Sequence, residues 1–152
     1  MEQKCIFCAI VNKQIPSFYV YEDEKFLAFL DIRPLNKGHT LVIPKEHHRW
    51  TYEVNDFGKY FEIAKKIALA AIISLDAKFV QFITMGLGVQ HAHIHVIPRF
   101  ENDGHAELPD AANTKQMSEQ ELKEIAEKIK SSIPVEQPKV EEKVEPPKEK
   151  RK

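Results

Sequence analysis

Residues 91–97 read His-Ala-His-Ile-His-Val-Ile, a strict alternation of polar and apolar side chains. A period of two is typical of a β-strand, because successive side chains on a strand point to opposite faces. The segment is therefore predicted to be a strand that places His91, His93 and His95 on one face. The apolar residues of the other face can pack on a helix, whereas three imidazoles would waste core space. The histidine face is predicted to be a functional site.

Two chemistries suit three imidazoles in a row. His-x-His pairs on strands often bind a metal ion, and a histidine can also act as a nucleophile while its neighbours handle phosphate charge. All seven histidines of the chain fall between His39 and His105, which also points to a role for this side chain. The remaining interpretation, histidines of the surface or core without a function, suits a single histidine better than three alternating ones.

The apolar pattern along the rest of the chain predicts an α+β fold. Short β-type runs lie at 19–22, 26–31, 39–43 and 79–85, with a turn at 23–25 and a loop at 33–38. Apolar residues at three- and four-residue steps predict an amphipathic helix from a cap at Asn55 or Asp56 to Leu75. Ser118 and Glu121 form a capping-box pattern that opens a last helix over 118–130, and residues 5–11 suit a short helix or turn. We expect a five-stranded, mainly antiparallel sheet with the long helix on one face and the C-terminal helix at its edge.

Composition and charge limit the number of domains and the kinds of partner. The 152 residues suit one domain, and 43% of them are hydrophobic. Residues 134–152 hold four of the nine prolines and eleven charged residues, so we predict a domain over 1–132 and a disordered tail over 133–152. A formal net charge of −1 gives no reason to expect binding to nucleic acid or a membrane. With no signal-peptide core and no apolar run near the roughly 20 residues of a membrane span, the expected location is the cytoplasm.

The two cysteines, Cys5 and Cys8, have a Cys-x-x-Cys spacing. In a reducing compartment this spacing favours a metal site or redox chemistry over a structural disulfide. A thioredoxin-like redox pair would be expected in a βαβ context, which the pattern lacks. A metal site and a pair of free thiols are the interpretations that stay open.

The run 91–97 resembles the motif of the histidine-triad (HIT) family, in which histidines alternate with apolar residues. Six further segments are similar to landmarks of the same family, in the same order: Cys5–Cys8, Ile15–Pro16, Tyr21–Glu24, Leu27–Ile32, Gly38–Lys45 and Pro98–Arg99. The resemblance covers roughly residues 5–99, and the C-terminal helix more loosely. It implies a HIT-like fold, a homodimer, and hydrolysis or nucleotidyl transfer at the α-phosphate of nucleoside phosphoramidates or dinucleoside polyphosphates.

The resemblance also implies roles for individual residues. His93 would attack phosphorus and form a nucleotidyl-histidine, while His39 and His95 would stabilise the phosphate and His91 would complete the catalytic set. Asp31 matches the position that holds the ribose hydroxyls, because a carboxylate can accept two hydrogen bonds. Other expected contacts to a purine nucleotide or dinucleotide come from Phe29, Ile32, Gly88 and Val89. The apolar candidates for a base pocket are Phe7, Ile10, Phe29, Ile32 and Leu41, although ordinary core packing is the better explanation of each one taken singly.

The resemblance extends to a zinc-containing branch of the family. In that branch the Cys-x-x-Cys pair is completed by a histidine after the strand at 39–43 and by the first histidine of the triad. Here the implied ligands are Cys5, Cys8, His47 and His91, and the neighbouring His48 competes with His47. Four such ligands would close a tetrahedral, structural zinc site.

The match fails just before the triad. Many family members carry a glutamine and a serine or threonine there, which contact the phosphate and the leaving group. This chain has Gly-Leu-Gly-Val-Gln at 86–90, so its Gln90 is displaced and no hydroxyl is present. Backbone amides of this loop could donate instead. Besides the enzyme, two alternatives therefore stay open: a nucleotide-binding regulatory module with little turnover, and a catalytic metal ion held by His91, His93 and His95.

Overall fold

The computed structural model describes residues 5–134, so most of the predicted tail lies outside the described residues. In chain order the elements are α1 (Ile6–Val11), β1 (Tyr19–Glu22), β2 (Phe26–Leu30), β3 (Thr40–Pro44), the short 3₁₀ helix η1 (Thr51–Glu53), α2 (Phe57–Leu75), β4 (Phe79–Thr84), β5 (Ile94–Arg99) and α3 (Glu119–Ser132). The predicted α+β class and the predicted order of strands and helices are confirmed.

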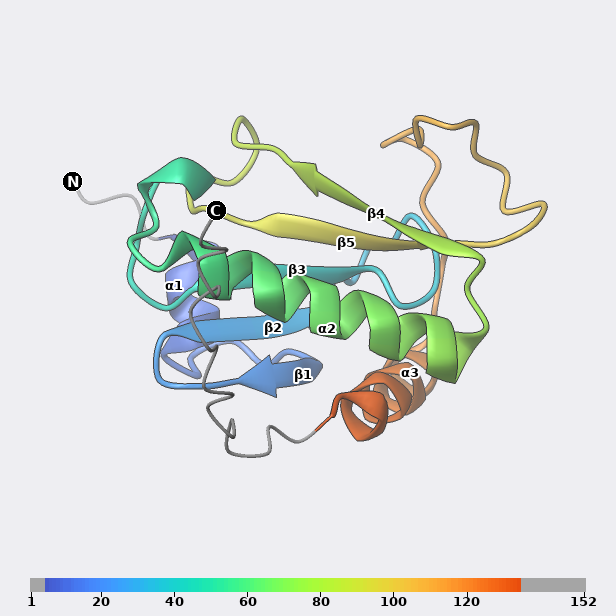
Figure 1. Cartoon of the computed structure of the whole chain (residues 1–152), viewed down its shortest axis with the longest axis horizontal. Coiled ribbons are helices and arrows are strands. Elements are labelled where there is room, and N and C mark those ends of the chain that lie inside the picture. Colours follow the sequence, from blue (N-terminus) through green and yellow to red (C-terminus); the bar gives the residue numbers. More distant parts are fainter. Residues whose placement is uncertain (1–4, 135–152) are drawn as a thin grey trace, which may run out of the picture.

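The strands form one sheet in the order β1-β2-β3-β5-β4, and each neighbouring pair is antiparallel. α2 crosses one face of this sheet with α3 beside its end, and α1 lies behind the opposite face (Figure 1). β5 follows all other strands in the chain but is inserted between β3 and β4. The histidine run therefore leads into a strand with neighbours on both sides.

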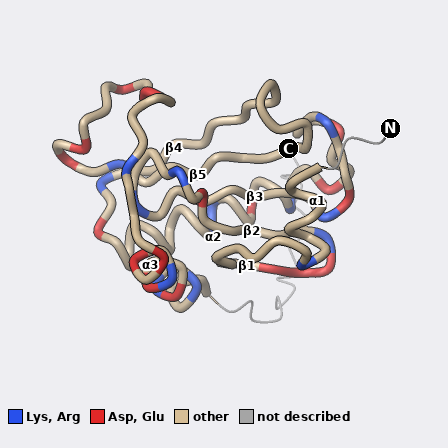
Figure 2. The backbone as a smooth tube through the Cα atoms, turned by 180° about the vertical axis from the view of Figure 1, so that it is seen from behind, with Lys and Arg blue, Asp and Glu red and all other residues tan. Residues whose placement is uncertain are grey.

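The two faces of the sheet bury two separate apolar clusters. The larger cluster joins α2 and α3 to one face and includes the strand residues Ala28, Val42, Ile94 and Val96. The smaller cluster joins α1 to the other face and consists of Phe7, Ile10, Leu27, Phe29, Leu41 and Ile43. His95 pairs with Leu41 across β3 and β5, and directly opposed residues point to the same side of a sheet. The histidines therefore lie on the α1 face, which is turned toward the viewer in Figure 2.

The two long helices begin where their caps were predicted. α2 starts after Asp56, whose backbone carbonyl accepts from the Tyr60 N–H at 3.0 Å, although the Asp56 side chain makes no capping hydrogen bond. The buried Tyr60 hydroxyl donates to the Val42 carbonyl at 2.9 Å and so ties α2 to β3. α3 starts with the predicted capping box, in which Ser118 and Glu121 each accept from the other's backbone N–H.

The predicted bounds of the histidine strand, 91–97, are wrong at both ends, because β5 covers Ile94–Arg99. The residues before Ile94 have other backbone partners. The Ala92 N–H donates to the His48 carbonyl at 2.7 Å, and the His91 carbonyl accepts from the His93 ring at 2.6 Å. The alternation nevertheless has the predicted effect, since Ala92 joins Ile94 in the cluster beneath α2.

Charged residues gather on the loops and along α3, where both signs are mixed (Figure 2). The longest described helix, α2, has 19 residues and carries Lys59, Glu62, Lys65 and Lys66. Within residues 5–134, no helix combines the length and the apolar character needed to cross a membrane.

Gly38, in the loop between β2 and β3, combines a positive φ with close packing around its Cα. Its φ is +84°, and a Cβ there would lie 2.5 Å from Leu75 Cδ1 and 3.2 Å from Pro98 Cγ. We expect Gly38→Ala to lower the free energy of unfolding by about 2 kcal/mol, because a left-handed backbone strains alanine and the core is overfilled. Urea denaturation would measure the change. Gly58→Ala is the control, since a Cβ on Gly58 meets nothing within 4 Å. Equal midpoints for the two variants would contradict the prediction.

Candidate active site and metal centre

Four imidazoles and one phenyl ring form a continuous row on the α1 face of the sheet. The ring centroids of His39 and His95 are 5.1 Å apart, and those of His95 and His93 are 4.9 Å apart. Phe7 of α1 contacts the rings of His93 and His91, at 5.2 and 5.8 Å. The structure thus brings together the four histidines predicted to be catalytic, and each of them is at most 7% exposed.

Two backbone carbonyls determine where the protons lie on His91 and His93. The Pro44 carbonyl lies 2.8 Å from Nε2 of His91, so this nitrogen donates and Nδ1 keeps its lone pair. The His91 carbonyl lies 2.6 Å from Nδ1 of His93, so this nitrogen donates and Nε2 keeps its lone pair. A neutral imidazole has one donor and one acceptor nitrogen, and each assignment therefore follows from the carbonyl alone.

A backbone N–H determines the proton positions of the other two histidines. The Leu35 N–H donates to Nδ1 of His39 at 3.0 Å, so the proton of His39 is on Nε2. This proton is donated to Nδ1 of His95 at 2.9 Å, which leaves the proton of His95 on Nε2. Nε2 of His95 is buried and has no hydrogen-bond partner among the described residues. A buried donor without a partner is uncommon in folded proteins, and here it points to a group that binds from outside.

The three histidines of the run therefore do not all present the same chemical group. His91 offers a lone pair toward the cysteines, His93 offers a lone pair at Nε2, and His95 offers an N–H donor. One metal ion held by all three would need three converging lone pairs, and His95 has none to offer. The arrangement suits a nucleophile beside a hydrogen-bond donor better than a metal ion held by the triad.

Burial lowers the pKa values of these histidines. Burial alone lowers the pKa of His39 to about 4, and burial followed by the charges of His39 and His93 lowers that of His95 to about 3. Burial also lowers the pKa of His93, against the opposing effects of the His91 carbonyl and the Asp31 carboxylate. The three imidazoles are therefore neutral near pH 7, so the lone pair on Nε2 of His93 is available for attack.

A second cluster lies at the other end of the row of rings. The Sγ atoms of Cys5 and Cys8 are 3.4 and 3.5 Å from Nδ1 of His91, and the Cys8 Sγ is 3.3 Å from Nδ1 of His47. The two imidazole nitrogens are 3.1 Å apart, and all four atoms lie within 4.8 Å of one another. His48, the alternative to His47, lies instead 3.6 Å from Glu46.

The chemistry of these four donors fits a zinc ion. Two sulfurs and two imidazole nitrogens are a typical set for structural zinc, and the proton on Nε2 of His91 leaves Nδ1 free to act as a ligand. Burial, followed by the hydrogen bond and the charge of Cys5, raises the pKa of Cys8 to about 11. The Cys8 thiol therefore needs a cation beside it to ionise at neutral pH.

Asp31 lies at the end of β2, close to the histidine row. One carboxylate oxygen accepts from the Arg33 N–H at 2.8 Å, and the other is 3.9 Å from Nε2 of His39. Burial raises the pKa of this carboxyl. The neighbouring Ile32 is 67% exposed, whereas Phe29 is 3% exposed and packs edge-to-face on the ring of Phe7 in α1. Of these two apolar candidates for nucleotide binding, Ile32 alone presents its side chain to solvent.

The loop before the triad, residues 86–90, is held in place by Arg49 and Trp50. The Arg49 guanidinium donates to the Gly86 carbonyl and stacks on the Trp50 ring, 4.3 Å from its centroid. The Trp50 ring lies where a Cβ on Gly86 would be. Beyond this anchor the backbone around Gly88 is open, Val89 packs partly against the smaller cluster, and Gln90 is exposed.

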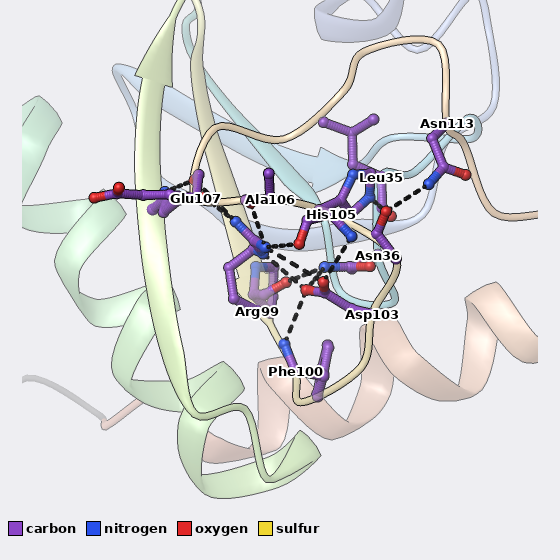
Figure 3. Close-up of polar contacts among 12 residues, drawn as sticks. Leu35, Asn36, Arg99, Phe100, Asp103, His105, Ala106, Glu107 and Asn113 are labelled. Carbon is purple, nitrogen blue, oxygen red and sulfur yellow. Dashed lines mark hydrogen bonds and ion pairs between the residues drawn. The ribbon is translucent and has the colours of Figure 1, made fainter.

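Sequence reasoning missed the segment between β5 and α3. Residues 100–117, which we refer to as the strap, contain no helix or strand and run beside the loop joining β2 and β3 (Figure 1). Arg99 holds the strap by donating to Asp103 at 2.7 Å and to the carbonyls of residues 105–107 at 2.8 to 3.1 Å (Figure 3). Most of these partners are backbone carbonyls, which leave no pattern in a sequence. The available signal was the i, i+4 pair of Arg99 and Asp103.

A model of the HIT domain family matches residues 12–102, which is more than half of the chain. With the antiparallel sheet and the histidine row, this match identifies the chain as a member of the HIT family. It is 50% identical over 109 residues to an uncharacterized HIT-like protein of Borreliella burgdorferi, covering 66% of this chain and 78% of that protein. It is 35% identical over 138 residues to the adenosine 5'-monophosphoramidase of Schizosaccharomyces pombe, covering 85% and 98%.

Solved structures of the family share the fold. A zinc-bound histidine triad family protein of Mycobacterium smegmatis superposes with a TM-score of 0.70 at 32% identity, over 86% of this chain and 93% of that one. A hypothetical histidine triad nucleotide-binding protein of Sulfolobus tokodaii superposes with a TM-score of 0.73 at 30% identity, over 85% and 91%. The suggested resemblance to the family is confirmed.

Proposed function

We propose that the protein is a nucleotide hydrolase or nucleotidyl transferase that acts at an α-phosphate through a covalent nucleotidyl-histidine on His93. The observation that carries the proposal is the set of proton positions in the histidine row. The carbonyl of His91 leaves a lone pair on Nε2 of His93, and the Leu35 N–H, acting through His39, leaves a donor on Nε2 of His95. A nucleophile beside a donor is what displacement at an anionic phosphate needs.

The proposed reaction has two displacements. Nε2 of His93 attacks phosphorus, a P–N bond forms, and the bond from phosphorus to the leaving group breaks as the leaving group takes a proton from solvent. The His91 carbonyl stabilises the positive charge that develops on the ring of His93, since it accepts from Nδ1. Water then attacks phosphorus and loses a proton to solvent, the P–N bond breaks and returns the lone pair to Nε2 of His93, and a nucleoside monophosphate leaves. The Nε2–H of His95 donates to a phosphate oxygen in both steps.

We propose that Asp31 holds the ribose hydroxyls of a purine nucleotide or dinucleotide. The carboxylate keeps one oxygen without a backbone donor, 3.9 Å from His39, and it lies beside the exposed Ile32. The open backbone around Gly88, next to Val89, can supply N–H donors in place of the missing hydroxyl side chain. The activity named for the fission-yeast relative, on an adenosine phosphoramidate, supports this substrate class.

The test is incubation of the full chain with adenosine 5'-phosphoramidate and, separately, with a diadenosine polyphosphate. We expect release of AMP and, on rapid quenching, a nucleotidyl adduct in the intact mass of the protein. If the protein binds nucleotide but yields neither product nor adduct, it is instead a nucleotide-binding regulatory module, our second candidate. That candidate is favoured by one observation, the lack of any hydroxyl side chain in residues 86–90.

We further propose that Cys5, Cys8, His47 and His91 hold a structural zinc ion. The four donor atoms lie within 4.8 Å of one another, and the zinc-bound relative from Mycobacterium smegmatis supports the choice of metal. The site would tie α1 to the segment that carries the nucleophile. A bound ion there adds folding free energy and takes no part in the displacement steps.

A homodimer is proposed as well. Exposed apolar side chains lie on α2 and on the edge strand β4, and they are Leu69, Ile72, Ile73, Phe79 and Phe82. Side chains of this kind are expected at contacts between subunits. Light scattering of the full chain should give about twice the single-chain mass of 17.6 kDa. A mass equal to one chain would count against the dimer.

A further inference from the structure

The loop between β2 and β3 holds the amide group on which the proton positions depend. The peptide unit between Pro34 and Leu35 is clamped at both ends. Its carbonyl accepts from the backbone N–H of Lys115, in the strap, at 2.7 Å, and its N–H donates to Nδ1 of His39 at 3.0 Å. A carbonyl that accepts a hydrogen bond polarises its amide, so the N–H becomes a better donor.

The strap also clamps the next peptide unit. The Leu35 carbonyl accepts from Nε2 of His105 at 2.8 Å. Nδ1 of His105 accepts from the Asp110 N–H at 3.3 Å, which leaves the proton on Nε2. The peptide units on both sides of the Leu35 Cα are therefore fixed, and Leu35 cannot rotate its N–H away from His39 without breaking a bond to the strap.

A buried ion pair between Arg99 and Asp103 holds the backbone of His105 in place. Asp103, with its side chain 5% exposed, accepts from Arg99 at 2.7 Å, from Asn36 at 2.8 Å and from the His105 N–H at 3.1 Å (Figure 3). The hydrogen bond from Arg99 holds the pKa of this carboxyl well below its usual range, so it stays ionised. Asn36 is 2% exposed and also donates to the Pro98 carbonyl at 2.9 Å. The strap and the β2–β3 loop thus form one rigid unit.

We propose that His105 is a positioning residue for the histidine row. By holding the Leu35 carbonyl, it acts together with the Lys115 N–H on the Pro34 carbonyl to keep the Leu35 N–H on His39, and thereby keeps the proton of His95 on Nε2, facing the site. The effect on rate rests on the proposed function, but the effect on proton positions does not. His105 touches neither the nucleotide nor the reacting atoms in this scheme, and it acts through one amide and two imidazoles.

The consequence of losing His105 follows from the hydrogen-bond pattern. Without His105, the strap holds the peptide units at Leu35 only through the Lys115 N–H on the Pro34 carbonyl, so the Leu35 N–H moves away from His39 more readily. The proton of His39 can then move to Nδ1, which leaves a lone pair on Nε2. His95 must then donate from its own Nδ1 to His39, and Nε2 of His95 becomes a lone pair as well. A lone pair facing a phosphate oxygen repels it, whereas the original N–H binds it.

The test compares His105→Phe, which keeps a ring but removes the donor, with His105→Gln, which keeps a donor near the same place. For His105→Phe we expect kcat to fall about tenfold with KM changed less than about twofold, the effect of one misplaced hydrogen bond. Nitrogen-15 NMR should show the proton of His95 shared between Nδ1 and Nε2. His105→Gln should restore most of both properties. The control is Asn113→Ala, which removes a hydrogen bond to the Gly104 carbonyl within the strap.

Each outcome decides between positioning and a merely structural role. If folded His105→Phe keeps the kcat and the proton positions of the natural chain, the proposal is overturned. It is also overturned if Asn113→Ala shows the same losses, because any loosening of the strap would then suffice. If the natural chain turns over no nucleotide, the NMR comparison still applies. A proton shift in His105→Phe alone would then support the positioning role while the proposed function fails.

Discussion

His93→Gly is expected to abolish turnover and the nucleotidyl adduct, with kcat reduced by at least about 10³-fold, because no nucleophile remains for the covalent route. Nucleotide affinity should stay within about threefold, since Asp31 and the donor on His95 are unchanged. The lost imidazole is uncharged, so its removal lowers the affinity for the phosphate only slightly. Steady-state kinetics, intact mass after rapid quenching and titration with AMP would measure the three quantities.

The histidines beside the nucleophile should matter less. His95→Ala should lower kcat by about a hundred- to a thousandfold, the usual effect of removing one donor to a developing charge. His39→Ala should lower kcat as well, because it removes the hydrogen bond that keeps the proton of His95 on Nε2.

The control for His93→Gly is His48→Gln, which removes an imidazole from a nearby loop that contacts the triad segment through its backbone. Its turnover should be close to that of the natural chain. Addition of free imidazole to His93→Gly gives a second check, because a small ring can occupy the vacated space and restore part of the reaction. Hydrolysis that persists in His93→Gly without added imidazole would falsify covalent catalysis at this residue.

Cys5→Ser should abolish zinc binding and lower the melting temperature by about 10–15 °C. When the free zinc concentration is about a thousand times the dissociation constant of the site, binding stabilises the fold by about 4 kcal/mol. The melting temperature of a domain of this size changes by roughly 3–4 °C per kcal/mol. Cys5 is also the N-cap of α1, where its sulfur accepts from the Cys8 N–H at 3.5 Å. Serine is a better N-cap than cysteine, so loss of the cap cannot explain a loss of stability. Elemental analysis and thermal unfolding would measure both effects.

The chelator experiment separates the metal from the side chain. A strong chelator should lower the melting temperature of the natural chain to near that of Cys5→Ser, and it should leave Cys5→Ser itself unchanged. His48→Gln is again the matched control, and it should keep both its zinc and its response to the chelator. Equal melting temperatures for the natural chain with and without the chelator, at full loss of zinc, would contradict a structural site.

The fold was predictable because its signals are local. A period of two over the histidine run, a period of three to four over α2, and the capping box at Ser118 each depend on residues close together in the sequence. The ends of β5 were misplaced because the partner of Ala92 is a carbonyl in a distant loop, at His48. No local pattern could indicate that the ladder stops short of the first histidines.

The site was predictable in its residue types and not in its supports. Alternation and family resemblance indicated which histidines to expect together, and the structure brings those residues together. The proton positions depend on three backbone groups, at Leu35, Pro44 and His91. Any residue but proline supplies an N–H and every residue supplies a carbonyl, so the residue type does not indicate which partner its backbone group will bond. The strap escaped notice for the same reason, since Arg99 holds it largely by carbonyls.

The order of the strands constrains how the protein can assemble as it is synthesised. β1, β2 and β3 emerge from the ribosome as consecutive antiparallel neighbours and can pair at once, whereas β4 has no partner until β5 follows and enters between it and β3. Cys5 likewise waits for His91, 86 residues later. The contacts that complete the sheet and bring His91 to the two cysteines are therefore made last, and contacts of long sequence separation form slowly. An incomplete nascent chain carries the cysteines and α1 but lacks the histidine run, so it has neither the proposed zinc site nor the proposed nucleophile.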